Sequence, residues 1–162
     1  MYEERPTQLR LLNDGAGILR INDRRQVERW IKKFNKEFPT CYFTIHTVDL
    51  KDHESAQSYG IWALNEPSYS DLPESSRSDS GLCLVIDVHK KQAAISYGYQ
   101  LEPYLNEQLC FNAIANAHPY MLDHSYIEAL ELMRHGIRKM MRSQARKANS
   151  ILKKKHLTDR IK

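Results

Sequence analysis

The feature that most constrains the fold is an unbroken apolar run, Gly81-Leu82-Cys83-Leu84-Val85-Ile86. A strand with one solvated face alternates polar and apolar residues, whereas a continuous apolar run is typical of a strand buried on both faces. Such a strand needs helices on both sides of its sheet. Together with the helical patterns on either side of the run, this predicts an α/β fold, a three-layer α/β/α sandwich with a central mixed sheet of about four strands.

The segments around this run carry periodic patterns of both kinds. Residues 23–38 place apolar side chains at helical spacing, with Asn22 as the expected cap and Pro39 as the stop. Asn13 to Gly17 is a turn signal, residues 1–12 show no clear pattern, and residues 66–80 form a long polar loop. The patterns further predict strands over 41–48 and 92–97, and helices from 52 or 55 to 65, from 106 or 107, and from 125 to beyond 141.

Charge is unevenly distributed along the chain. Residues 1–137 hold 19 acidic residues against 14 Lys and Arg, while residues 138–162 hold ten Lys and Arg against one acid, Asp159. One interpretation is contact with an anionic surface, such as phospholipid head groups, nucleic acid or an acidic protein. The other is a solvated last helix with a frayed tail. Residues 138–162 contain no aromatic side chain on which bases could stack, which argues against a dedicated nucleic-acid reader.

Several other classes of protein have no support in the sequence. No apolar stretch approaches the roughly 20 residues of a membrane span, and no signal peptide is visible. Cys41, Cys83 and Cys110 match no zinc or redox spacing, so we expect reduced thiols in or near the core. The methionines of the last helix fit a core stripe. No phosphate-binding loop or nucleophile motif is present, and the sequence names no catalytic residue.

Four carboxylates lie beside predicted turns or strand ends: Asp14, Asp79, Glu102 and Glu107. Ligands of open α/β sheets bind outside the carboxyl ends of the strands, where the loops gather. Carboxylates clustered there would repel one another unless a proton or a cation relieved the repulsion, and calcium accepts 6–8 such oxygen ligands. The alternative is that each acid is separately solvated.

Three segments resemble the TPM domain family, which includes a thylakoid photosystem-repair acid phosphatase and many bacterial envelope proteins. Asn13-Asp14-Gly15-Ala16-Gly17-Ile18-Leu19 is similar to the N-terminal signature of the family. Asp79-Ser80-Gly81 resembles its Asp-Asn-Gly step into the central strand, and Gly98-Tyr99-Gln100-Leu101-Glu102 with Glu107 resembles a Gly-Tyr-Gly-Leu-Glu signature followed by Asp. The resemblance implies a domain over residues 10–142, followed by a basic extension over 143–162.

The resemblance also implies a divalent-cation site, with Ca²⁺ or Mg²⁺ held by Asp14, Asp79, Glu102 and Glu107. Two positions depart from the family pattern: Gln100 replaces a glycine that could adopt positive φ freely, and Glu107 replaces the shorter Asp. Relatives are often exported or membrane-anchored. We expect a binding or accessory module for an envelope or membrane complex; the alternative is a metal-dependent, acid phosphatase-like hydrolase. The expected partners are a protein or an anionic membrane surface, met through Lys153, Lys154 and Lys155.

Overall fold

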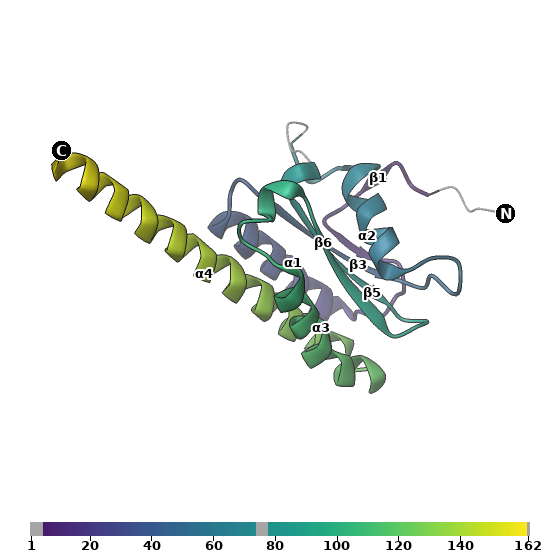
Figure 1. Cartoon of the computed structure of the whole chain (residues 1–162). Coiled ribbons are helices and arrows are strands. Elements are labelled where there is room, and N and C mark those ends of the chain that lie inside the picture. The colour runs from purple at the N-terminus through teal and green to yellow at the C-terminus, as the bar shows by residue number, and fades with distance from the viewer. Residues whose placement is uncertain (1–4, 74–77, 162) are drawn as a thin grey trace.

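The computed structural model describes residues 5–73 and 78–161 and shows a four-stranded sheet with helices on both faces (Figure 1). The strands are β1 (Gln8–Leu9), β2 (Leu12–Asp14), β3 (Tyr42–Val48), β4 (Ser68–Tyr69), β5 (Gly81–Asp87) and β6 (Gln92–Tyr97). The helices are α1 (Ile21–Glu37), α2 (Ala56–Asn65), α3 (Glu107–Leu122) and α4 (Tyr126–Ile161), with short 3₁₀ turns η1 (Ser78–Ser80) and η2 (Tyr99–Leu101).

The main sheet has the order β2-β3-β5-β6. The strands β2, β3 and β5 are parallel, and β6 returns antiparallel to β5 as a hairpin. Every residue of β3 and β5 is buried, as the continuous apolar run predicts for a central strand. The mixed four-stranded sheet predicted from the sequence is therefore confirmed.

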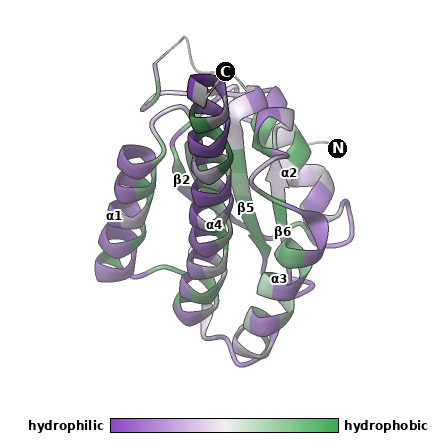
Figure 2. Ribbon diagram, turned by 60° about the vertical axis from the view of Figure 1, so that its left-hand side comes forward, coloured by the Kyte–Doolittle hydropathy of each residue, from purple (hydrophilic) through white to green (hydrophobic). Residues whose placement is uncertain are grey.

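The two faces of β3 show how the layers form. Phe43 packs on Phe34 of α1, with 5.0 Å between the ring centroids. Side chains alternate along the strand, so His46 points to the opposite face, where its ring lies 5.5 Å from that of Tyr59 in α2. The helices α1, α3 and α4 cover the face of the sheet that carries Phe43, and α2 covers the face that carries His46 (Figure 2). This arrangement confirms the three-layer sandwich.

Three of the four helices begin within one residue of a predicted start, and two of these three have the expected side-chain cap. The side chains of Ser55 and Asn106 accept N–H groups from the first turns of α2 and α3, at 3.1 and 2.8 Å. The prediction that Asn22 caps α1 is wrong, because the helix already begins at Ile21 behind Arg20, which provides no side-chain cap. The chain ahead of this helix is held by the carboxylate of Asp14, as described below.

Two short strand pairings have no counterpart in the sequence prediction. Leu12 to Asp14, partly assigned to a turn, forms the edge strand β2, and β1 pairs with β4 inside the expected loop over 66–80. The strands β1, β2 and β4 have only two or three residues each, too few for an alternating pattern to emerge. Residues 74–77 of that loop lie outside the described residues.

The last helix has two different halves. Its inner half buries Leu130, Met133, Ile137 and Met141, which confirms the methionine stripe as core. Its outer half continues without a break to Ile161 and extends away from the domain as an exposed helix (Figure 1). Across the described residues, no helix is both long and apolar enough to span a membrane.

Candidate functional site

Asp14 lies at the C-terminal end of β2 with its side chain only 1% exposed. One carboxylate oxygen accepts the N–H of Ile18 at 3.1 Å and the hydroxyl of Thr47. The other accepts the N–H of Leu19 at 3.0 Å and lies 3.4 Å from the guanidinium of Arg24. These four donors satisfy the carboxylate within the protein, so Asp14 fixes the turn between β2 and α1.

Asp79 lies at the opposite end of the strands. It precedes β5, whose first residue, Gly81, pairs with Tyr42 at the start of β3, whereas Asp14 pairs with Thr47 near the end of β3. With a rise of about 3.3 Å per residue, the two carboxylates are separated by roughly 15–20 Å along the strands. Because calcium–oxygen distances are about 2.3–2.6 Å, Asp14 and Asp79 do not share an ion in this arrangement.

Glu102 and Glu107 lie at the same end of the strands as Asp79. They follow the C-terminal end of β6, where Tyr97 pairs with Leu82, and both side chains are exposed. Burial chiefly, together with the neighbouring Cys110 and the charges of Glu107 and Glu102, raises the pKa of Tyr97 above its ordinary value.

The predicted four-carboxylate cation site therefore needs correction, since its members divide between the two opposite ends of the strands. Among the residues that the structure describes, no group of three or more His, Cys, Asp or Glu side chains is placed to hold a metal ion. The four residues do not fit one shared ion, and binding of Ca²⁺ or Mg²⁺ by this domain stays a prediction.

The glycine signature after β6 has a steric explanation. A Cβ on Gly98 would lie 2.3 Å from the backbone carbonyl of Asp79, so only glycine allows η1 and η2 to approach this closely. Gln100 stands inside η2 without a positive φ. A glycine is therefore not required at that position, and this departure from the family pattern leaves the local backbone unstrained.

A groove of about 850 Å³ runs along β6 between α2 and α3. Ile61 of α2 lies on one side, and Phe111 and Ile114 of α3 lie on the other, with Ile95 of β6 on the floor. Glu102 and Glu107 line the end near Tyr97. The volume lies within the range of about 300–1,000 Å³ that is typical of ligand clefts.

One face of α3 forms a wall of this groove. Glu107, Phe111, Ile114 and His118 recur at spacings of four, three and four residues and line the groove, while the residues that face α4 are buried: Cys110, Ala113, Ala117 and Met121. The sequence pattern of this helix did not predict the groove. The signal that could have found it is Phe111, a large aromatic residue off the buried stripe of the helix.

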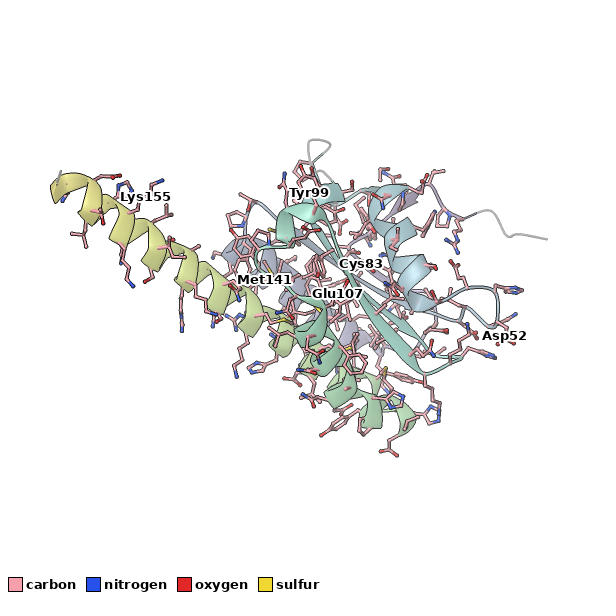
Figure 3. All side chains as sticks on the ribbon, in the orientation of Figure 1. Asp52, Cys83, Tyr99, Glu107, Met141 and Lys155 are labelled. Carbon is pink, nitrogen blue, oxygen red and sulfur yellow. The ribbon has the colours of Figure 1, made fainter. Side chains whose placement is uncertain are left out.

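The basic residues predicted to meet an anionic surface all lie on the outer half of α4. Lys153, Lys154 and Lys155 are exposed, and Figure 3 shows Lys155 far from the groove residue Glu107. Nearer the domain, the carboxylate of Glu37 binds the guanidinium of Arg138 at 2.9 Å and that of Arg142.

Electrostatics confirm that Glu37 anchors the root of this helix. Burial raises the pKa of Glu37, but the hydrogen bonds from Arg142 and Arg138 outweigh it and leave that pKa below its ordinary value. The α1 end of the domain thus holds the start of the exposed segment in place. The basic residues beyond Arg142 have no comparable ion pair among the described residues.

His46 is the most buried histidine and takes part in an internal polar network. Its Nε2 lies 3.0 Å from the Thr44 hydroxyl and 3.2 Å from that of Tyr69, and its Nδ1 lies 3.2 Å from the Tyr59 hydroxyl. Burial lowers the pKa of His46 to about 3 and raises that of the nearby Cys83 thiol strongly. Both side chains are completely buried, so they are part of the core.

Comparison with known proteins adds a family and a fold. The family model described as the TPM domain matches residues 12–140. The solution NMR structure of the N-terminal domain of a protein from P. gingivalis is similar with a TM-score of 0.65 and 18% identity, covering 82% of each chain. At this identity the likeness concerns the fold alone. No curated protein matches the chain in sequence.

Proposed function

Because the chain belongs to the TPM domain family, we propose that it is a binding module that attaches to anionic membrane surfaces through the outer half of α4 and serves a membrane complex there. The observation that carries the proposal is the exposed helix over residues 143–161. It holds six Lys and Arg residues against one acid, Asp159, whereas the body of the domain is acidic.

The electrostatic attraction between this helix and an anionic bilayer is large enough to support binding. Each Lys or Arg near an anionic bilayer contributes about 1 kcal/mol, so six residues supply several kcal/mol at low salt. The helix reaches roughly 28 Å over 19 residues, which brings Lys153, Lys154 and Lys155 about 15 Å or more beyond residue 143, farther than one Debye length of about 8 Å.

Apolar residues on the same segment favour a lipid partner over an acidic protein. Ile151, Leu152 and Leu157 are 66%, 54% and 60% exposed among the basic side chains. Such residues can enter the boundary between head groups and acyl chains while Lys and Arg stay at the phosphates.

The test is sedimentation with vesicles of phosphatidylcholine alone or mixed with phosphatidylserine. We expect binding only to the mixed vesicles, lost in salt and in the triple variant Lys153→Glu, Lys154→Glu, Lys155→Glu. The matched control is Lys32→Glu, Lys33→Glu, Lys36→Glu, an equal change of charge on the exposed face of α1. Equal binding of both triple variants would contradict the proposal.

The alternative, a metal-dependent hydrolase, would have to use Asp79, Glu102 and Glu107 without Asp14, whose carboxylate is satisfied within the protein. Hydrolysis of an aryl phosphate that depends on added Ca²⁺ or Mg²⁺ and disappears in Asp79→Ala would favour the hydrolase. The same rate in Asp79→Ala would reject this assignment.

A further inference from the structure

The outer edge of β6 has backbone groups that point into the groove. The N–H of Gly98 donates to the carbonyl of Gly81 at 3.0 Å, which fixes which residues of β6 face β5. In an antiparallel pair this direction alternates, so Ala94 and Ser96 bond to β5 while Ala93, Ile95 and Tyr97 direct their N–H and C=O groups outward. Within the described residues, β6 pairs with no other strand.

This edge lacks the devices by which proteins protect an open strand. Charged side chains, prolines and bulges normally prevent pairing with another chain. The sequence of β6, Gln-Ala-Ala-Ile-Ser-Tyr, contains no charge and no proline, and it pairs with β5 in unbroken register. The edge is therefore a template for one more strand.

The walls of the groove supply contacts for the side chains of such a strand. Side chains of an added strand alternate between the two faces of the sheet. One set would reach Ile61, which is 53% exposed on α2, and the other would reach Phe111, which is 64% exposed on α3. Main-chain pairing combined with apolar contacts for alternate side chains is a known mode of peptide recognition.

Charge determines what should lie at one end of the strand. Glu102 and Glu107 are exposed at the end of the groove near Tyr97. Both carboxylates can accept hydrogen bonds from a long cationic side chain, whereas they would repel an acidic residue at the same place.

We propose that β6 and its groove bind an extended segment of a partner protein as a fifth strand, with alternating apolar residues and a Lys or Arg beside Glu102 and Glu107. This goes beyond membrane attachment, because it assigns a second, separate surface. The basic helix would hold the domain at the bilayer while the groove takes the partner.

The first experiment measures amide hydrogen exchange by NMR. In the free protein we expect slow exchange at Ala94 and Ser96 and fast exchange at Ala93, Ile95 and Tyr97. The probe is a capped octapeptide of alternating valine and threonine with lysine at its first or last position. The peptide should slow exchange at the three outward amides by about tenfold or more. Outward amides that stay fast at saturating peptide, or that are already slow in a monomer, would overturn the proposal.

Variants test each part of the proposal by fluorescence anisotropy. The double variant Glu102→Lys, Glu107→Lys should lower the affinity for the lysine peptide by about tenfold. It should raise the affinity for a peptide that carries aspartate in place of the lysine. Phe111→Ser changes an exposed side chain and should lower the affinity for both peptides. Ala93→Pro removes one outward N–H and leaves the β5 ladder intact, so it should weaken binding without unfolding the domain.

Three controls separate this proposal from its rivals. A peptide N-methylated at alternate residues keeps its side chains but loses the donors that β6 needs, and it should not bind. The triple glutamate variant of Lys153, Lys154 and Lys155 should bind the peptide normally, so failure of membrane attachment leaves this result unaffected. A β6-dependent dimer in sedimentation equilibrium that excludes the peptide would assign the edge to a second copy of the chain and overturn the proposal.

Discussion

His46 makes the stability of this domain depend on pH in a range where carboxylates contribute little. The ring is completely buried in the folded protein, where burial lowers its pKa to about 3, against an ordinary value of 6.5. Below pH 6.5 the ring of His46 therefore binds a proton in the unfolded chain but stays neutral in the folded protein, and this difference favours unfolding. The stabilising effect of the neutral ring is complete above pH 6.5 and declines from there toward pH 3.

The size of this effect follows from the same two values. Each pH unit inside the window lowers the free energy of unfolding by about 1.4 kcal/mol, so going from pH 7 to pH 5 costs about 2 kcal/mol. For a domain of this length that corresponds to a fall in Tm of about 4–8 °C. Asp and Glu titrate mostly below this window, near pH 4.

Urea unfolding followed by tryptophan fluorescence at a series of pH values measures the effect, because Trp30 is buried in the core. His46→Gln should lower stability at pH 7 but remove most of the slope between pH 6.5 and pH 5. His53→Gln, at an exposed position, should keep the slope. A wild-type slope that survives His46→Gln, or a stability that does not change over this range, would refute the reasoning.

Two further predictions concern residues at the two ends of the strands, Gly98 and Asp14. Gly98→Ala places a methyl group against the backbone of Asp79, which cannot yield as a side chain would, so we expect a loss of about 1–3 kcal/mol in urea unfolding; unchanged stability would show that η1 and η2 are not tightly apposed. Asp14→Asn weakens the charged acceptor for Ile18, Leu19 and Thr47, and should lower stability by about 2–4 kcal/mol equally in calcium and in chelator. A loss seen only with calcium would make Asp14 a metal ligand after all.

The sequence predicted those parts of the fold whose signal is local and repeated. The run from Gly81 to Ile86 indicated a central strand because every residue in it is buried, and Ser55 and Asn106 cap their helices through contacts three residues away. The strand β2 was not predicted, because it has only three residues and forms by pairing with β3, which is more than 30 residues away in the sequence.

The candidate site was less predictable because it depends on which end of the strands each loop reaches. Asp14 ends one strand and Asp79 precedes another, so parallel pairing places them at opposite ends of the strands. The groove was hidden for a related reason. Phe111 becomes informative only when α4 is seen to cover the other face of α3.

The unbroken course of α4 has a mechanical consequence. Because Met133, Ile137 and Met141 fix its inner half in the core, the outer half cannot swivel as it would on a flexible linker. A bilayer that captured Lys153 and its neighbours would therefore also determine the tilt of the whole sheet and the direction in which the β6 edge opens. Inserting a glycine pair after Ser143 would break this coupling while leaving both surfaces chemically intact.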